Sequence, residues 1–192
     1  MRSASVLTVA LCLLLGILAG PAVAQAPAPS TSTGSAAGTG LVAEVCGQCK
    51  NKDLCLSSLN ADPNSKGADL SALTLIAIRV AIANATDTVS YIQKELSDTS
   101  LEPGVQQALS DCAENYDDAV QQLDDSIAAL TIRNYADLRK WVQTAAADAD
   151  TCSAGARAAG SDNLGLSNRS KTFRQLCNNA ITIIGILEKN KQ

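Results

Sequence analysis

The chain has 192 residues, a formal net charge of −4 and no histidine. Without histidine, a Ser-His-Asp relay is excluded, and the usual general base near neutral pH and the commonest metal ligand are missing. An acidic chain without basic runs also makes a poor binder of nucleic acid or of an anionic membrane. These properties favour a protein that binds another protein, with no cofactor.

The N-terminus has the pattern of a secretory signal peptide over residues 1–24. Arg2 precedes an apolar run over residues 6–18, and residues 22–24 form the small-x-small pattern that signal peptidase reads. Because the run is shorter than the roughly 20 residues that span a bilayer, cleavage before Gln25 is favoured over a membrane anchor.

A low-complexity stretch follows the cleavage site. Apart from Gln25 itself, residues 25–40 contain only Ala, Pro, Ser, Thr and Gly. This composition predicts a flexible leader. The remainder, residues 41–192, is long enough for one domain with its own core. We therefore expect a secreted protein with a single folded domain.

The folded part begins with a predicted helical hairpin over residues 41–64. Two short amphipathic segments, 41–48 and 53–59, are each too short to be stable alone. The breaker cluster at residues 62–67 ends the hairpin.

Four longer segments within residues 69–192 carry apolar residues at alternating steps of three and four, which predicts helices with one buried face. Pro103 is suited to begin the second, residues 155–165 read as a loop, and no segment shows the alternation of a strand. The sequence predicts an all-α fold, an up-down-up-down four-helix bundle after the hairpin. The four stripes are Leu75, Ile78, Ile82, Ala85, Val89, Ile92 and Leu96; Val105, Leu109, Cys112, Tyr116, Ala119, Leu123, Ile127 and Leu130; Tyr135, Leu138, Val142, Ala145, Ala149 and Cys152; and Phe173, Leu176, Ala180, Ile183 and Leu187.

Six cysteines remain after signal cleavage, as expected for a stapled exported protein. Cys112 lies in the first half of its helix and Cys152 near the end of the next, so the two come level in an antiparallel pair. A bond between Cys46 and Cys55 would close the hairpin. Spacing alone does not choose among the fifteen pairings.

Two patterns invite a chemical interpretation. Cys46-Gly47-Gln48-Cys49 is a Cys-x-x-Cys motif, but zinc would need a second ligand pair, and a thioredoxin-like site needs a strand before the helix. A disulfide framework with one extra cysteine is favoured. The carboxylate pairs Asp117-Asp118, Asp124-Asp125 and Asp148/Asp150 could serve a glycosidase, yet adjacent helical residues point in different directions. We expect no catalytic residues, no metal site and no enzyme.

An acidic face is the remaining feature that could bind a partner. Glu114 and Asp118 lie opposite the apolar stripe of their segment, together with Gln121 and Asp125. Such a face is commonly only solvated; the functional alternative is a contact surface for a protein. Asn84 and Asn168 each begin an N-glycosylation sequon.

Several separated motifs resemble the plant inhibitors of pectin methylesterase and invertase. The Cys46 to Cys55 spacing, residues 54–56 and the Asp62-Pro63 pair fit the family. Residues 112–119 are very similar to its Cys-x-Glu-x-Tyr-x-x-Ala helix, and residues 148–152 match its fourth cysteine. The resemblance covers most of the folded part.

The resemblance implies the same bundle and hairpin, with disulfides Cys46–Cys55 and Cys112–Cys152. It also implies a non-catalytic inhibitor secreted to the plant apoplast and cell wall. Residues 135–141 look like the Tyr-x-x-Leu-x-x-Trp motif of the pectin methylesterase branch. A pectin methylesterase inhibitor is therefore favoured, and an inhibitor of cell-wall or vacuolar invertase is the alternative.

By similarity, the bundle would cover the substrate cleft of the esterase in a 1:1 complex, with Glu114, Asp118 and Thr151 at the contact. The chain departs from the family pattern at Cys49 and in its long leader, and a bond from Cys49 to Cys177 is left open. A different class, a small-ligand or structural cell-wall protein, is the second alternative, although the stripes of Ala, Ile, Leu and Val suit close packing more than a cavity.

Overall fold

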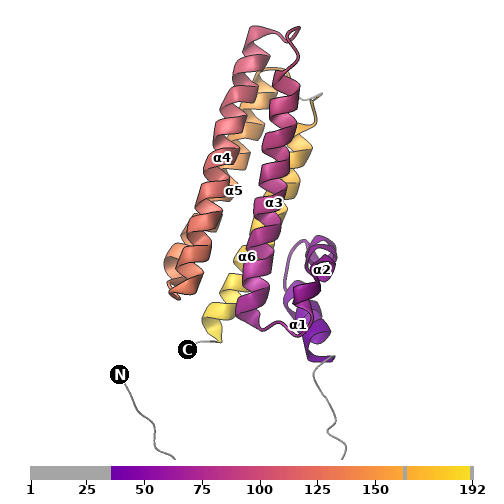
Figure 1. Ribbon diagram of the computed structural model, residues 1–192, viewed down its shortest axis with the longest axis vertical. Helices are drawn as coiled ribbons and strands as arrows, with labels where there is room; N and C mark the ends of the chain where they lie inside the picture. The colour runs from indigo at the N-terminus through magenta and orange to yellow at the C-terminus, as the bar shows by residue number, and fades with distance from the viewer. Residues whose placement is uncertain (1–35, 162–163, 191–192) are drawn as a thin grey trace, which may run out of the picture. The chain divides into compact units, whose positions relative to one another are not determined.

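A bundle of four long antiparallel helices, preceded by a helical hairpin, forms the described part of the chain (Figure 1). The computed structural model describes residues 36–161 and 164–190. The predicted signal peptide and residues 25–35 of the leader lie outside this part. The predicted all-α bundle is confirmed. The described elements are α1 (Ala36–Gly47), α2 (Lys52–Ala61), the 3-10 turn η1 (Pro63–Ser65), α3 (Leu70–Leu96), α4 (Pro103–Thr131), α5 (Tyr135–Ala158) and α6 (Leu166–Lys189).

Local signals in the sequence set the ends of the long helices. Asp69 caps α3, because its carboxylate accepts a 2.8 Å hydrogen bond from the backbone N–H of Ala72. Pro103 is the first residue of α4, where its missing N–H costs nothing. Asn134 caps α5 through the backbone N–H of Asp137. Gly165, with φ of +68°, makes the left-handed turn into α6.

Each long helix packs against two others, so that α3 contacts α4 and α6, and α5 contacts the same two. The apolar faces meet in a core that includes the fully buried Tyr116 and Phe173, whose ring centroids lie 5.4 Å apart. The Tyr116 hydroxyl donates a 3.2 Å hydrogen bond to Ser170, which satisfies its polar atom inside the bundle. Burial raises the pKa of Tyr116 to about 12, against a smaller opposing effect of this hydrogen bond.

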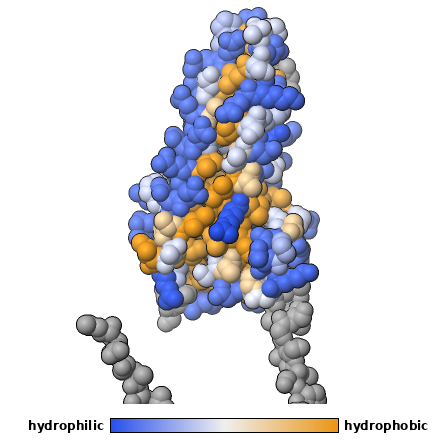
Figure 2. All heavy atoms as spheres, viewed as in Figure 1, coloured by the Kyte–Doolittle hydropathy of each residue, from blue (hydrophilic) through white to orange (hydrophobic). Residues whose placement is uncertain are grey.

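The buried face of α3 differs from the predicted stripe. Leu75, Ile82 and Leu96 are only partly buried, whereas buried positions include Thr74 and Thr88, whose hydroxyls bond backbone carbonyls one turn earlier. The prediction went wrong because apolar residues surround the first half of this helix, so hydropathy alone does not choose a face. Some of the apolar residues therefore remain on the surface, and Figure 2 shows apolar surface gathered over the lower half of this view.

The helix α3 is also long and apolar enough to cross a membrane by length and composition alone. Half of its most apolar window is buried inside the bundle. One such helix, packed against two neighbours, is weak evidence for a membrane span.

Two predicted boundaries are wrong. The first helix begins at Ala36, inside the stretch predicted to be a flexible leader, because Ala36 and Ala37 favour a helix and the apolar residues after them give it a buried side. The predicted loop over residues 155–165 begins later, since α5 continues to Ala158 and buries Ala156. Packing against the bundle overrides the low helix propensity of Gly155.

The hairpin packs against both α6 and α3 of the bundle. The Asn179 side chain donates a 3.3 Å hydrogen bond to the backbone oxygen of Asn51, in the turn between α1 and α2. The Cys49 thiol lies 3.9 Å from the backbone oxygen of Asn179. Cys49 and Cys177 are both buried free thiols. Because burial raises the pKa of each, both stay protonated and unreactive near neutral pH.

Two disulfides hold the structure together, Cys46–Cys55 in the hairpin and Cys112–Cys152 between α4 and α5. These are the pairs that the family resemblance implied. The second bond joins Cα atoms 4.6 Å apart across a sequence separation of 40 residues. It therefore sets the register of α4 against α5.

We expect the double variant Cys112→Ala, Cys152→Ala to unfold more easily than the parent, by about 4 kcal/mol in the chain-entropy description of a loop this long. The Cys46–Cys55 bond closes a loop of 9 residues. Its removal in the double variant Cys46→Ala, Cys55→Ala should lower the free energy of unfolding by about 3 kcal/mol. Urea titrations followed by circular dichroism measure both. An unchanged midpoint for the first variant would contradict the structural role given to this bond.

Candidate protein-binding face on α4 and α5

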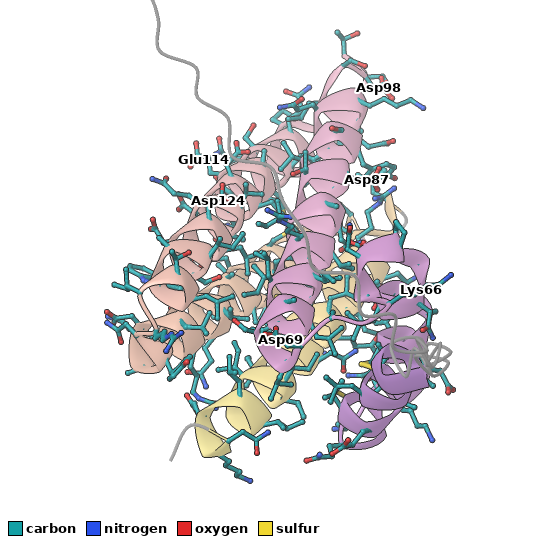
Figure 3. The ribbon with its side chains drawn as sticks, turned by 60° about the horizontal axis from the view of Figure 1, so that its bottom comes forward. Lys66, Asp69, Asp87, Asp98, Glu114 and Asp124 are labelled. Carbon is teal, nitrogen blue, oxygen red and sulfur yellow. A yellow bond between two sulfur atoms is a disulfide. The ribbon has the colours of Figure 1, made fainter. Side chains whose placement is uncertain are left out.

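The outward side of α4 is strongly acidic. The helix contains six carboxylate residues and no Lys or Arg. Glu114 and Asp118 are exposed and one turn apart, so their side chains lie on one face of the helix (Figure 3 labels Glu114). The other four are Asp111, Asp117, Asp124 and Asp125.

The third predicted contact residue, Thr151, is brought to the same region by the fold. It precedes Cys152 on α5, and the bond from Cys152 to Cys112 places it level with the start of the acidic face. Thr151 is exposed, and its hydroxyl donates a 3.1 Å hydrogen bond to the backbone oxygen of Ala147. With its donor used inside α5, the hydroxyl oxygen remains able to accept a bond from a partner.

A fourth polar group, Asp148, lies on α5 one turn before Thr151. Its Oδ2 atom is buried without a hydrogen-bond partner, and so is the Oε1 atom of Gln122 on α4. Burial, the largest cause, raises the pKa of Asp148, and the nearby charge of Asp118 raises it further. The neighbouring Gln122 side chain opposes this rise of the pKa. Asp118, Gln122 and Asp148 therefore form one coupled polar cluster between the two helices.

This arrangement suits the recognition of hydrogen-bond donors. The face presents exposed carboxylates on α4 and an exposed hydroxyl acceptor on α5. A basic side chain of a partner would satisfy such acceptors with charge-assisted hydrogen bonds. Among the described residues, no group of three or more potential ligands could hold a metal ion.

The sequence alone did not point to Asp148 and Gln122 as members of this face. Asp148 was weighed as half of a carboxylate pair and as part of the motif around the fourth cysteine, and Gln122 was not singled out. Their juxtaposition depends on the register of α5 against α4, which no local pattern contains. The helical spacing Asp118 to Gln122 was the only available signal.

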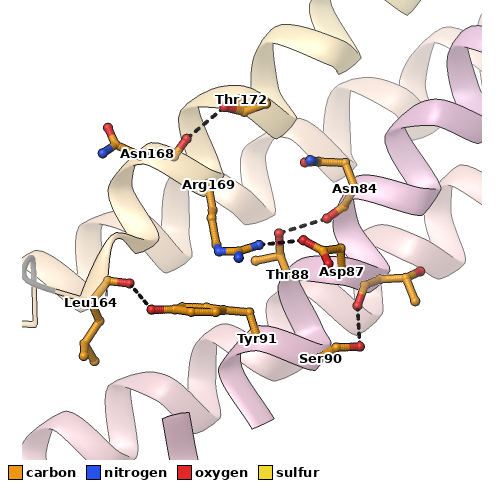
Figure 4. A network of polar contacts seen from close by, with 10 residues as sticks. Asn84, Asp87, Thr88, Ser90, Tyr91, Leu164, Asn168, Arg169 and Thr172 are labelled. Carbon is orange, nitrogen blue, oxygen red and sulfur yellow. Dashed lines mark hydrogen bonds and ion pairs between the residues drawn. The ribbon is translucent and has the colours of Figure 1, made fainter. Parts of the chain in front are cut away.

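The two predicted glycosylation positions differ in accessibility. Asn168 is exposed in the first turn of α6, whereas Asn84 is partly buried in α3 and its Oδ1 atom is buried without a partner. Between them, Arg169 forms a 2.7 Å ion pair with Asp87 and stacks over the ring of Tyr91 (Figure 4). These contacts join the start of α6 to α3.

Comparisons with known proteins identify the family of this chain. The profile of the family described as plant invertase/pectin methylesterase inhibitor matches residues 40–183. A pectinesterase inhibitor of Actinidia deliciosa is 34% identical over 112 residues, which cover 58% of this chain and 60% of that protein. An inhibitor of Arabidopsis thaliana described as cell wall / vacuolar inhibitor of fructosidase 2 is 35% identical over 78 residues, 41% of this chain and 43% of that protein.

The fold has a counterpart among solved structures. The crystal structure of a mutant form of a pectin methylesterase inhibitor from Arabidopsis superposes with a TM-score of 0.64 at 27% identity, covering 74% of this chain and 93% of that one. The sequence match to the Actinidia inhibitor is shorter, spanning 60% of its length. The chain belongs to the plant invertase/pectin methylesterase inhibitor family, and the relatives named above are inhibitors rather than enzymes.

Proposed function

We propose that this chain is a secreted inhibitor of pectin methylesterase that acts in the plant cell wall. In this proposal, the face formed by α4 and α5 docks over the substrate cleft of the esterase in a 1:1 complex and excludes methylesterified pectin sterically. The main support is the joint presence of family membership and an α4 that carries six acidic and no basic residues.

The contact would be carried by Glu114, Asp118 and Thr151, with Asp148 and Gln122 beside them. The carboxylates and the Thr151 oxygen accept hydrogen bonds, so the matching surface of the enzyme should supply Lys, Arg or other donors. Because α4 and α5 are disulfide-linked and packed along their length, little ordering is needed on binding. A rigid face of this kind inhibits by occupying the cleft, without chemistry of its own.

The choice of enzyme rests on a weaker observation. In the motif over residues 135–141, Leu138 is buried in the core, whereas Tyr135 and Trp141 are partly exposed. Of the three positions that define the motif, only the two aromatic ones can therefore contact a partner directly. Invertase is the second candidate, favoured by the similarity to the fructosidase inhibitor of Arabidopsis thaliana. A small-ligand carrier is less favoured, since the surface groove of about 460 Å³ at the end of α4 includes Asp69 and Arg133 in its lining.

A titration against a plant pectin methylesterase and a cell-wall invertase, run in parallel at about pH 5 and pH 7, tests the proposal. We expect stoichiometric loss of esterase activity and no loss of invertase activity. Loss of invertase activity alone would replace the favoured enzyme by the second candidate. No effect on either enzyme would overturn the proposal.

Single variants locate the contact. Glu114→Gln, Asp118→Asn and Thr151→Val should each weaken esterase inhibition about 10-fold or more, because a hydrogen bond to a charged group contributes roughly 1.5–3 kcal/mol. Glu44→Gln, at an exposed position on α1, is the matched control and should leave the inhibition constant unchanged. Equal effects of Glu44→Gln and Glu114→Gln would show that net charge, not this face, matters.

The raised pKa of Asp148 predicts how the free inhibitor responds to pH. Burial favours its protonated form in the folded state, so its stabilising contribution is present at low pH and is lost as the pH rises through the folded pKa. Asp148→Asn should therefore unfold at a higher temperature than the parent at pH 7, with the difference shrinking towards pH 4. Melting curves across this range measure it. Asp124→Asn, exposed on α4, serves as the control, and a parallel shift in both variants would contradict the prediction.

We further propose that Asn168 carries an N-glycan and that Asn84 does not, because only Asn168 is exposed. The mass of the protein secreted from a plant host, compared before and after enzymatic removal of N-glycans, should reveal a single glycan. Asn168→Gln should abolish the mass difference and Asn84→Gln should preserve it. The reverse pattern would show that the chain is modified before α3 packs.

A further inference from the structure

Positive charge is concentrated on the side of the molecule formed by α6 and the turn of the hairpin. The net charge of the whole chain is negative, and α4 carries no basic residue, so the Lys and Arg residues lie on the other elements. Five of the 15 Lys and Arg residues line adjoining hollows there, against only two carboxylates. The basic residues are Lys50, Lys52, Arg157, Lys171 and Arg174, and the acidic ones are Asp53 and Asp150.

Three hollows run into one another along this surface. One of about 260 Å³ lies between α5 and α6 and shares Lys171 and Arg174 with the next, of about 360 Å³. The second shares Lys50, Asn51 and Gln175 with a third, of about 440 Å³, which reaches α2. We name this continuous feature the basic groove. Three adjoining hollows suit an extended chain better than a single small anion.

The cations of the basic groove are available for a ligand. Lys50 and Lys171 are exposed and form no ion pair within the described part of the chain. Arg174 lies 3.1 Å from Asp150, but both side chains are about half exposed, at 46% and 54%, and an exposed pair of this kind is held weakly. Its guanidinium also has more N–H groups than one carboxylate can use.

A buried contact beneath the basic groove fixes the hairpin turn against α6. The Asn179 side chain bonds the backbone of Asn51 and so fixes the hairpin turn, which carries Lys50, against α6. The same Asn179 is only 4% exposed, and its Oδ1 atom is buried without a partner. Lys50 and Lys171, distant in sequence, are thereby held on one surface.

We propose that the basic groove binds an acidic polysaccharide whose sugar units carry carboxylates at regular intervals, such as de-esterified pectin. Repeated carboxylates match the row of Lys50, Lys171 and Arg174, and the amides of Asn51, Gln175 and Asn178 suit sugar hydroxyls. The choice of pectin rests on the proposed function, because an esterase acting on pectin would release this polymer. The polysaccharide class itself rests on the groove alone.

Other anionic ligands fit the lining less well. Single-stranded nucleic acid is usually held by aromatic side chains on which bases stack, and no Phe, Tyr or Trp lines the three hollows. A stable protein interface needs an apolar centre, and Leu54 is the only large apolar residue in the lining. A polysaccharide of carboxylated sugars needs neither stacking aromatic side chains nor an apolar centre.

Fluorescence anisotropy with a labelled galacturonate oligomer, in EDTA and at low salt, tests the proposal. The parent protein should bind, the affinity should fall steeply with added salt, and the triple variant Lys50→Gln, Lys171→Gln, Arg174→Gln should bind about 10-fold more weakly. A fully methylesterified oligomer should bind far more weakly than the acidic one. Because Asn168 lines one end of the groove, measurements are made before and after removal of N-glycans.

A charge-matched control separates the groove from net charge. Lys66→Gln, Lys94→Gln and Lys189→Gln, all at exposed positions outside the groove, remove the same charge and should leave binding unchanged. Equal loss in both triple variants, equal binding of a sulfated dextran, or no binding by the parent would each overturn the proposal. Normal oligomer binding by the groove variant would overturn the proposal, and impaired esterase inhibition in that variant would show that the groove also contacts the enzyme.

The experiment distinguishes this inference from the proposed function. Inhibition of the esterase is measured on the same variants with a soluble substrate. If the parent inhibits the enzyme but does not bind the oligomer, only the groove assignment fails. If it binds the oligomer without inhibiting the enzyme, the groove stands and the proposed function fails.

Discussion

The alignment of α4 against α5 is the constraint on which the proposed binding face depends. The Cys112–Cys152 bond joins the first half of one helix to the last part of the next and sets their register. That register brings Asp148 against Asp118 and Gln122, and it places Thr151 beside the acidic face. A slip of one turn would keep the helices and the core but separate these polar groups. The disulfide therefore contributes to geometry as well as to stability.

Charge is divided between two sides of the molecule. The outward side of α4 is acidic, whereas the basic groove lies along α6 and the hairpin turn. A net charge of −4 gives no hint of this separation. Under the two proposals, one surface takes a basic region of an enzyme and the other an acidic polymer, so the molecule would hold an inhibited esterase close to the product of that enzyme. Both surfaces include residues of α5, but α4 belongs only to the acidic face, whereas α6 and the hairpin turn belong only to the basic groove.

The strength of the sequence patterns explains which predictions succeeded. In α4 the stripe through Leu109, Tyr116 and Leu123 is strictly periodic and its opposite side is charged, so both its type and its buried face were predictable. In α3 the first half is apolar all round, and the buried face was partly misassigned. Helix ends with strong signals, such as Asp69 and Pro103, were located well. Ends without such signals, such as Ala36 and Ala158, depend on packing and were placed wrongly.

By itself, the sequence determined the all-helical architecture, the family and the acidic character of α4, because each of these is carried by spacing along one segment. Only the tertiary structure decided which polar groups from different helices meet. The cluster of Asp118, Gln122 and Asp148 and the groove shared by Lys50, Lys171 and Arg174 both join residues from separate elements. Their proximity follows from helix register and hairpin docking, which depend on the packing of whole side chains rather than on local periodicity.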